Sequence, residues 1–283
     1  MAEPEIAVVI PTRERPESLV RCVAALEAQT ARDSLEIVIV DDAGCGPGAI
    51  ANLIGRPAGC RVVDGPGRGA AAARNLGAAA AGAPLVLFTD DDCEPLPGWA
   101  ASLAAVLQDE AAAVAGSTVT NPGAGPLALA SQHVADFLTT FTLDRAGRTR
   151  FAASSNLGCR TEVLERIPFD GGYPGAGGED RDWCVRLIEA GHELVLVPEA
   201  RVAHRQQLDL RAFWGKHLAY GRGARMFHHR HGFPDTQGVG RFHVRLVRDA
   251  IRRHGATVGA LVCLAQVATA VGFAGKALTD RSR

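Results

Sequence analysis

Short, continuous apolar runs limit most strongly how this chain can fold. Residues 6–10, 36–40 and 85–89 are rich in Ile, Val and Leu, and residues 61–63 form a shorter run of the same kind. Apolar runs of this length that do not alternate with polar residues are typical of strands buried on both faces of a parallel sheet. The chain is therefore predicted to contain such a sheet.

Helical patterns stand between these runs. Pro16 suits the first helical position and Glu17 suits the first turn, and apolar residues follow at helical spacing. The residues expected to face the core in this helix are Leu19, Val20, Val23 and Leu26. Residues 70–81 predict an alanine-rich helix and residues 98–108 another. This alternation of strand and helix implies right-handed βαβ units and an α/β fold.

Acidic residues stand where two of the predicted strands end. Asp42 follows one strand, and Asp90, Asp91 and Asp92 follow another. Mostly parallel sheets bind their ligands at the carboxyl ends of the strands. Three adjacent carboxylates repel one another unless a cation lies among them, and a hard divalent ion that also binds phosphate oxygens suits this place. A solvated acidic turn is the alternative.

The second half of the chain is less regular. Residues 113–118 predict a strand, the pattern loosens over residues 121–126, and regularity returns near Ser154. Residues 171–178 form a glycine-rich loop that leads into a helix, and residues 193–197 predict a further strand.

The segment after residue 207 differs in composition from the rest. Residues 241–253 hold several arginines among apolar residues, whereas residues 255–275 contain no charged residue and approach the roughly 20 residues that span a bilayer. Many small residues and Gln266 weaken insertion into a membrane. Peripheral contact with anionic headgroups and a helical pair packed on the protein both fit this pattern.

Charge and cysteine content narrow the class of protein. A net charge of -1 and a pI near 6.8 give no reason to expect nucleic-acid binding. Seven cysteines without CxxC pairing favour neither a disulfide framework nor a zinc ribbon, so a reducing compartment is expected. The first ten residues lack the basic and long apolar regions of a secretory signal, and a cytoplasmic location is expected.

Five segments stand in a characteristic order along the chain. They are VVIPTRERPESL (8–19), EIVIVDDAG (36–44), GRGAAAARNLGAAAAGAPLVLFTDDDC (67–93), SSNLGCRTEVL (154–164) and GGEDRDWCVRLIEAGHELVLVPEARVAH (177–204). Each is weakly specific alone, but together they resemble the family 2 glycosyltransferases over about residues 5–205. The resemblance implies a GT-A fold, which is a Rossmann-like, mostly parallel nucleotide-binding sheet flanked by helices, here with a C-terminal helical appendage.

The resemblance assigns a nucleotide to the ends of the first strands. Pro11, Thr12 and Glu14 match the loop that contacts the nucleoside, and Asp42 matches the carboxylate that accepts a hydrogen bond from the base. Arg74 matches a residue near the diphosphate, where a guanidinium would balance phosphate charge. Ordinary turn and surface roles for these residues are the alternatives.

The same resemblance implies a metal site on the DxD motif. Asp92 would ligate Mn²⁺ or Mg²⁺ directly, Asp91 would face the ribose, and Asp90 would support the site or reach the metal through water. His204 matches the histidine that completes the metal shell in many relatives. A satisfied polar histidine is the alternative for this last position.

Glu179 and Asp180, which follow the glycine-rich loop, resemble the family's ED motif. Asp180 would be the general base that takes the proton from the acceptor hydroxyl. Glu179 is the less favoured base, or a group that binds the acceptor. Because acidic residues also suit a helix N-terminus, a purely structural role is the alternative.

The function implied by the resemblance is inverting, metal-dependent transfer of a sugar, of the hexosyltransferase type. The donor would be a nucleoside diphosphate sugar, with a UDP-sugar favoured, and the acceptor a hydroxyl of a saccharide or a lipid-linked molecule. Residues 1–207 would form the catalytic domain, with residues 1–120 as donor half and 121–207 as acceptor half, and residues 208–283 would form a helical segment. A homodimer and membrane contact at the inner face of the cell membrane are left open.

Other classes of protein share parts of this pattern. A catalytically silent nucleotide-sugar-binding or scaffold protein would keep the same residues. A sugar nucleotidyltransferase would need a glycine-rich phosphate loop after the first strand, and a dinucleotide dehydrogenase would need GxGxxG there. Residues 11–16 contain no glycine, which argues against both.

Overall fold

A computed structural model describes residues 3–42, 44–109, 111–119, 121, 123–173, 177–232 and 236–280. The chain divides into two compact units. Unit 1 consists of Met1–Val119, Thr142–Gly172 and Asp180–Arg205, and unit 2 consists of Thr120–Phe141, Tyr173–Glu179 and Gln206–Arg283. The division into donor half, acceptor half and C-terminal segment concerns function and stays a prediction.

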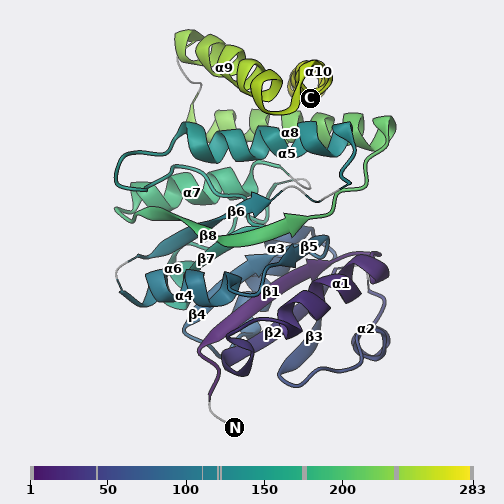
Figure 1. The fold of residues 1–283 in the computed structure, drawn as a ribbon, viewed down its shortest axis with the longest axis vertical. Coiled ribbons are helices and arrows are strands. Elements are labelled where there is room, and N and C mark those ends of the chain that lie inside the picture. Colours follow the sequence, from purple (N-terminus) through teal and green to yellow (C-terminus); the bar gives the residue numbers. More distant parts are fainter. Residues whose placement is uncertain are drawn as a thin grey trace. The chain divides into compact units, whose positions relative to one another are not determined.

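Unit 1 contains an eight-stranded sheet with the order β3-β2-β1-β4-β7-β6-β8-β5 (Figure 1). Its strands are β1 (Ile6–Thr12), β2 (Leu35–Asp41), β3 (Cys60–Asp64), β4 (Leu85–Thr89), β5 (Cys93–Pro95), β6 (Ala113–Val119), β7 (Asn156–Arg160) and β8 (Leu194–His204). The pairs among β1 to β4 are parallel, as is β6 with β8. The sheet is therefore the mostly parallel one expected, although β7 pairs antiparallel with β4 and β6, and β5 antiparallel with β8.

Helices cover both faces of this sheet. They are α1 (Pro16–Glu27), a 3-10 turn (Arg32–Ser34), α2 (Pro47–Leu53), α3 (Ala70–Ala80), α4 (Trp99–Asp109), α6 (Thr161–Arg166) and α7 (Glu179–Glu189). In β1, alternate residues enter two different cores: Val8 packs with side chains of α1 and α4, and Val9 packs with side chains of α3, α6 and α7. This burial on both faces explains why the strand is continuously apolar.

Two details of the first βα unit differ from expectation. Val20, which is expected in the core-facing stripe of α1, is 38% exposed, whereas Cys22, which is not expected there, is buried. Strand β1 does not end at Pro11 but continues to Thr12. Because β4 pairs with β1 only as far as Val9, Pro11 lies where β1 has a strand on one side only, and its missing N–H is tolerated there.

Strand β8 is longer than the five residues expected. It continues through Pro198 to His204, and its register against β6 shifts between Gly116 and Ser117. Val197 pairs with Gly116 and Arg201 pairs with Ser117, so Pro198 lies in the irregular stretch between them, where it needs no ladder hydrogen bond. The shift carries β8 on to His204 at the end of the sheet.

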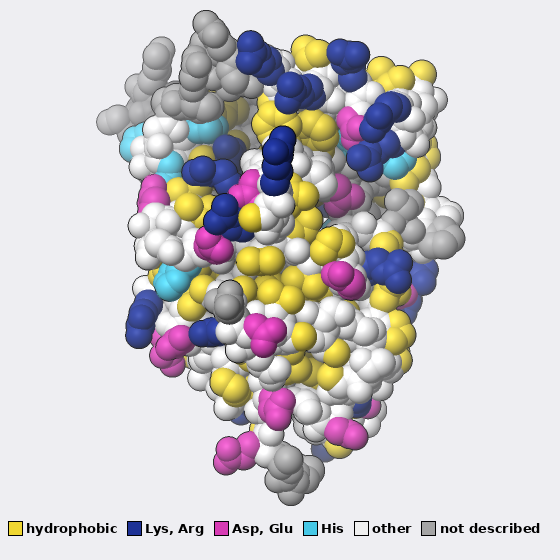
Figure 2. Space-filling model, turned by 60° about the vertical axis from the view of Figure 1, so that its left-hand side comes forward, with side chains coloured by type: hydrophobic (Ala, Val, Ile, Leu, Met, Phe, Trp, Pro, Cys, Tyr) yellow, Lys and Arg dark blue, Asp and Glu magenta, His cyan; other side chains and the backbone are white. Residues whose placement is uncertain are grey.

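Unit 2 is helical. Its helices are α5 (Pro126–Phe141), α8 (Leu210–His231), α9 (Thr236–His254) and α10 (Ala256–Asp280). They share a core that includes Ala130, Phe213, Leu246 and Val262, one residue from each helix. Helices α9 and α10 lie over α5 and α8 (Figure 1), and Lys and Arg side chains stand beside hydrophobic ones in this part of the surface (Figure 2).

Sequence patterns did not reveal α5. Its buried residues include Ala128, Ala130, Ser131 and His133, which are small or polar and give no clear apolar stripe. Among the described residues, one helix is long and apolar enough to cross a membrane: α10 over Ala256–Gly275, with a mean hydropathy of 1.8 and a third of its most apolar stretch buried.

Candidate active site

The carboxyl ends of β1 and β4 bring the first group of polar residues together. These strands are parallel neighbours, so Thr12 at the end of β1 reaches the acidic turn after β4. The Thr12 hydroxyl donates a hydrogen bond of 2.8 Å to Asp91, and both residues are buried. Arg15, in the loop before α1, donates to Asp91 at 3.2 Å and to Asp92 at 3.1 Å. One guanidinium thus bridges two carboxylates.

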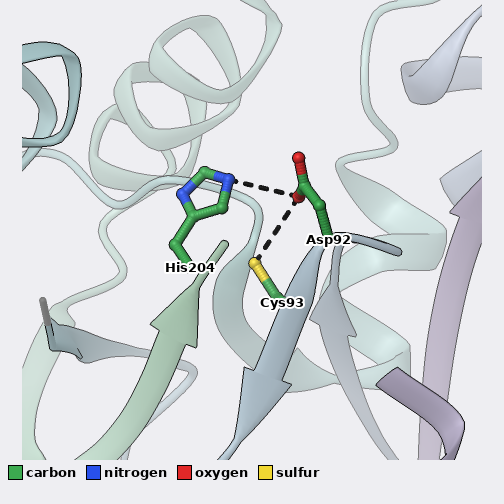
Figure 3. Close-up of side chains that lie close together, drawn as sticks. All are labelled: Asp92, Cys93 and His204. Atoms are coloured by element: carbon green, nitrogen blue, oxygen red, sulfur yellow. Dashed lines mark hydrogen bonds and ion pairs between the residues drawn. The ribbon is translucent and has the colours of Figure 1, made fainter. Parts of the chain in front are cut away.

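Asp92 also meets His204, which comes from a distant part of the chain (Figure 3). Strand β5 pairs with β8 so that Cys93 lies opposite His204, and this register places the imidazole beside Asp92. His204 Nε2 is 3.1 Å from Asp92 Oδ1, and the Cys93 thiol is 3.9 Å from the same oxygen. Among the described residues, Asp92, Cys93 and His204 form a cluster whose donor atoms lie within 4.8 Å of one another.

Cys93 contributes a neutral group to this cluster. Burial, and then the charges of Asp92 and Asp90, raise the pKa of the Cys93 thiol well above its ordinary value. Thiol sulfur in any case favours softer metals than Mn²⁺ or Mg²⁺. The carboxylate of Asp92 and the imidazole of His204 are the donors that a hard cation could use.

Burial and neighbouring charges shift the pKa values of two groups in this site. Burial raises the pKa of Asp91 to about 6, although Arg15 and the Thr12 hydrogen bond act in the opposite direction. For Arg15, burial lowers the pKa, but the charges of Asp92 and Asp91 outweigh it and hold the pKa above its ordinary value. A further cation near these carboxylates would favour their charged forms.

Asp42 lies just after the carboxyl end of β2. Its Oδ2 accepts a 2.9 Å hydrogen bond from the backbone N–H of Gly69, just before α3, and its own N–H donates to the carbonyl of Thr12 at 2.9 Å. The other oxygen, Oδ1, is buried and has no hydrogen-bond partner among the residues the structure describes. Since a buried acceptor left unsatisfied is costly, this oxygen is suited to an N–H donor from a ligand.

Arg74 and Asp90 form a separate pair beside this group. Arg74, buried in α3, donates to Asp90 Oδ1 at 2.8 Å, and its guanidinium carbon lies 5.9 Å from the centre of the Phe169 ring. The structure therefore places the Asp90 carboxylate with Arg74, whereas Asp92 lies with Arg15 and His204.

The remaining predicted site residues lie at two places. Pro11 is within β1, and Glu14 is exposed in the following loop with φ of +55°, a left-handed conformation that asparagine adopts more easily than glutamate. Glu179 and Asp180 begin α7. The Glu179 carboxylate accepts from the N–H of Gly177 at 2.8 Å, and the Asp180 carboxylate accepts from the N–H of Arg181 at 2.8 Å. The three residues 174–176 of the predicted glycine-rich loop lie outside the described part of the chain.

Two residues that lie in the site, Arg15 and Cys93, are not among those predicted from the sequence. Arg15 is one charged residue in a loop with several, and Cys93 reads as an ordinary core cysteine after the acidic turn. A signal for Arg15 exists: a cation in the loop after a strand that neighbours the acidic strand is expected at the same edge of a parallel sheet.

Comparison with known sequences gives consistent matches. The family model described as "Glycosyl transferase family 2" matches residues 7–167. A pre-mycofactocin glycosyltransferase of Mycobacterium tuberculosis is 32% identical over 241 residues, which cover 80% of this chain and 48% of that protein. The glycosyltransferase AglE of Haloferax volcanii is 25% identical over 211 residues, with 71% and 67% covered. The chain thus spans about half the length of the first of these relatives.

Solved structures share the fold. The mannosyltransferase PcManGT from Pyrobaculum calidifontis, in complex with GDP-Man and Mn²⁺, superposes with a TM-score of 0.62 at 16% identity, covering 100% of this chain and 81% of that one. GalNAc-T7 with UDP, GalNAc and Mn²⁺ superposes with a TM-score of 0.61 at 19% identity, covering 86% and 54%. The predicted GT-A fold is therefore confirmed. The chain belongs to the family 2 glycosyltransferases.

Proposed function

We propose that the protein is an inverting, metal-dependent glycosyltransferase that moves one sugar from a nucleoside diphosphate sugar to an acceptor hydroxyl. One observation carries the proposal: the carboxylate of Asp92, in the acidic turn after β4, lies 3.1 Å from the imidazole of His204, at the end of β8. Family membership and two similarly folded proteins whose structures hold a nucleotide and Mn²⁺ support it.

The residues present fit a divalent cation. Asp92 and His204 would hold it, and Asp90, fixed by Arg74, would support the site from one side. Arg15 places one positive charge between Asp91 and Asp92, so a cation is stabilised beside these two carboxylates. A bound Mn²⁺ or Mg²⁺ would supply Lewis-acid stabilisation of the negative charge that develops on the leaving diphosphate.

The nucleoside is expected at the ends of β1 and β2. The unsatisfied oxygen of Asp42 suits an N–H donor of the base, a group that both uracil and guanine possess. Pro11, Thr12 and Glu14 would contact the nucleoside, and Asp91 would face the ribose. A UDP-sugar stays the preferred donor, and the two similarly folded proteins hold GDP-Man in one case and UDP in the other.

The chemical step is a single displacement. Asp180 takes the proton of the acceptor hydroxyl, the acceptor oxygen forms a bond to the anomeric carbon, and the bond from that carbon to the diphosphate oxygen breaks. Attack from the face opposite the leaving group inverts the anomeric configuration. Arg74 would help to balance the charge of the departing diphosphate, and Glu179, whose carboxylate accepts a hydrogen bond from Gly177, would bind the acceptor.

Replacement of Asp180 by Asn tests this assignment. We expect kcat to fall by several orders of magnitude while the fold is retained, because the base is removed without loss of volume. The readout is single-turnover transfer from the preferred nucleotide sugar with Mn²⁺ present. Glu189→Gln, an exposed change on the same helix, is the matched control and should leave kcat unchanged. Near-normal turnover by folded Asp180→Asn protein would refute the base.

A catalytically silent nucleotide-sugar-binding protein would retain the same residues. Purified protein with Mn²⁺ should transfer or slowly hydrolyse the donor if the proposal holds, whereas a silent protein would bind it unchanged. The acceptor, as a saccharide or a lipid-linked molecule, and a homodimer stay predictions.

A further inference from the structure

The outward side of α10 is an uninterrupted apolar stripe. The exposed residues of this stripe are Ala260, Cys263, Val267, Ala270, Val271 and Ala274. Their spacing of three and four residues places them on one face of the helix. Val267 is 53% exposed and Val271 is 49% exposed, and no charged residue occurs between Ala256 and Gly275. A contiguous apolar stripe on the exposed face of a helix is typical of a site that contacts another surface.

The inward side of α10 packs against α8. Backbone approaches backbone at two glycines: a Cβ on Gly221 would lie 2.0 Å from the Thr269 oxygen, and a Cβ on Gly272 would lie 2.1 Å from the Leu218 oxygen. Contacts this close need glycine on both helices. Helix α10 therefore cannot be surrounded by lipid without losing its partner, and a membrane would meet its outer stripe only.

Helix α9, which shares a core with α10, adds positive charge to the surface of unit 2. It contains five arginines and one aspartate, Asp249, whose carboxylate pairs with Arg252 and Arg253. The exposed apolar residues Val244 and Ile251 stand among these arginines, at 58% and 47% exposure. Figure 2 shows this mixture of Lys or Arg and hydrophobic side chains at the top of the drawn face. Interspersed arginine and apolar residues are complementary to anionic headgroups above an acyl layer.

A groove extends the apolar surface to the start of α8. It has a volume of about 460 Å³ and is lined by Leu210, Arg211, Trp214 and Leu264. Leu210 is 58% exposed. Tryptophan with a neighbouring arginine is the combination that membrane–water interfaces favour, because the ring is apolar with one polar edge and the cation meets headgroups.

We propose that α9, α10 and the start of α8 form a docking surface for an anionic lipid bilayer, with α10 lying in the plane of the interface. A second copy of the chain fits this surface less well, since a symmetric contact would bring the arginines of both copies together. The proposal is independent of the proposed catalytic function, because lipid binding needs neither donor nor acceptor.

Fluorescent labelling gives a direct test. Cys263 lies on the stripe, and Cys45, also exposed, lies in unit 1, so an environment-sensitive dye can be placed at either one by changing the other to serine. With vesicles of phosphatidylglycerol and phosphatidylcholine, the dye at Cys263 should shift to shorter wavelength and the dye at Cys45 should not. Vesicles of phosphatidylcholine alone should give a much smaller shift, and added salt should weaken binding.

Paired substitutions separate the apolar contribution of α10 to membrane binding from the electrostatic contribution of α9. Val267→Gln with Val271→Gln, and separately Arg241→Glu with Arg248→Glu, should each weaken vesicle co-sedimentation by about ten-fold or more. Val20→Gln on α1 and Arg166→Glu on α6 are matched exposed controls in unit 1 and should bind as the parent does. Absence of binding to anionic vesicles would overturn the proposal. A Cys263 shift that depends on protein concentration without lipid would also overturn it, and would assign the surface to a second copy.

Discussion

The guanidinium of Arg15 stands among carboxylates that the proposed mechanism assigns to a metal and a nucleotide. It lies 3.1 Å from Asp92 and 3.2 Å from Asp91, and its side chain is 56% exposed. Two cations close to the same carboxylate repel each other. Arg15 is therefore expected to compete with a divalent ion until a nucleotide supplies additional negative charge.

Arg15→Ala should raise the affinity for Mn²⁺ in the absence of nucleotide by several-fold, because a competing charge is removed from Asp92. Isothermal titration calorimetry of the purified protein measures this directly. Arg13→Ala, in the same loop and exposed, should leave Mn²⁺ affinity unchanged. An unchanged or lower affinity in Arg15→Ala would show that Arg15 does not occupy the place of the ion.

His217 is a buried histidine whose environment disfavours its protonated form. It is fully buried in α8 between Phe213 and Tyr220, and neither ring nitrogen has a hydrogen-bond partner in the described part of the chain. Burial, and then the charge of Lys216, lower the pKa of His217 to about 4. The folded protein therefore keeps this ring neutral at pH values where the unfolded chain, with a pKa near 6.5, binds a proton.

The free energy of unfolding should consequently be constant with respect to His217 above about pH 6.5 and decrease as pH falls towards 4, by up to about 3 kcal/mol. His217→Phe should remove this part of the pH dependence and cost little stability, because an apolar ring replaces an unsatisfied polar one. Urea unfolding at several pH values is the measurement, with the exposed His229→Gln as control. An identical pH profile in His217→Phe would contradict the assignment.

At the scale of elements, helix α8 uses glycine to bring α10 close. Gly221 faces the backbone of α10, whereas Gly215, on the same helix, has open space around the position of a Cβ. The two glycines therefore have opposite consequences when a methyl group is added, although both lie within one helix and both would gain helix propensity.

Gly221→Ala should lower the free energy of unfolding by about 2 kcal/mol or more, because the added carbon meets the Thr269 carbonyl. Gly215→Ala should instead raise it by up to about 1 kcal/mol through helix propensity. Thermal or urea denaturation of the two variants in parallel provides the comparison. Equal effects of the two changes would mean that α8 and α10 do not pack as described.

Elements differ in how far sequence patterns predicted them. Strand β1 and helix α3 were anticipated within a residue or two, because an apolar run and an alanine-rich stretch are local signals. Helix α5 was not, since it buries small and polar residues. Strand β8 continued through Pro198 because the register shift against β6 absorbs the proline, and that shift is not visible in the sequence of β8 alone.

For the whole molecule, binding of the donor should raise the free energy of unfolding and therefore the Tm. A donor that binds the folded chain only stabilises it by about 2.7 kcal/mol at a concentration of 100 times Kd, which corresponds to a Tm increase of several degrees. We expect one class of nucleoside diphosphate sugar, with a UDP-sugar preferred, to give this shift with Mn²⁺ and a smaller one without it.

The same Tm measurements with nucleoside diphosphate sugars, made on Asp92→Ala protein, serve as the control for metal dependence. Because Asp92 is the proposed ligand, the difference between samples with and without Mn²⁺ should disappear in this variant while the Tm of the free protein stays near that of the parent. A retained Mn²⁺ effect would place the ion elsewhere in the molecule.

Local sequence patterns determined the α/β class, the parallel strands and the position of the acidic residues at strand ends, because each depends on residues that are neighbours in the chain. Only the tertiary structure decided which charges meet. Arg15 pairs with Asp91 and Asp92, and Arg74 pairs with Asp90. The pairing of β5 with β8 places His204 beside Asp92. Those contacts depend on strand order and register, which arise from packing across the whole sheet and leave no local signature.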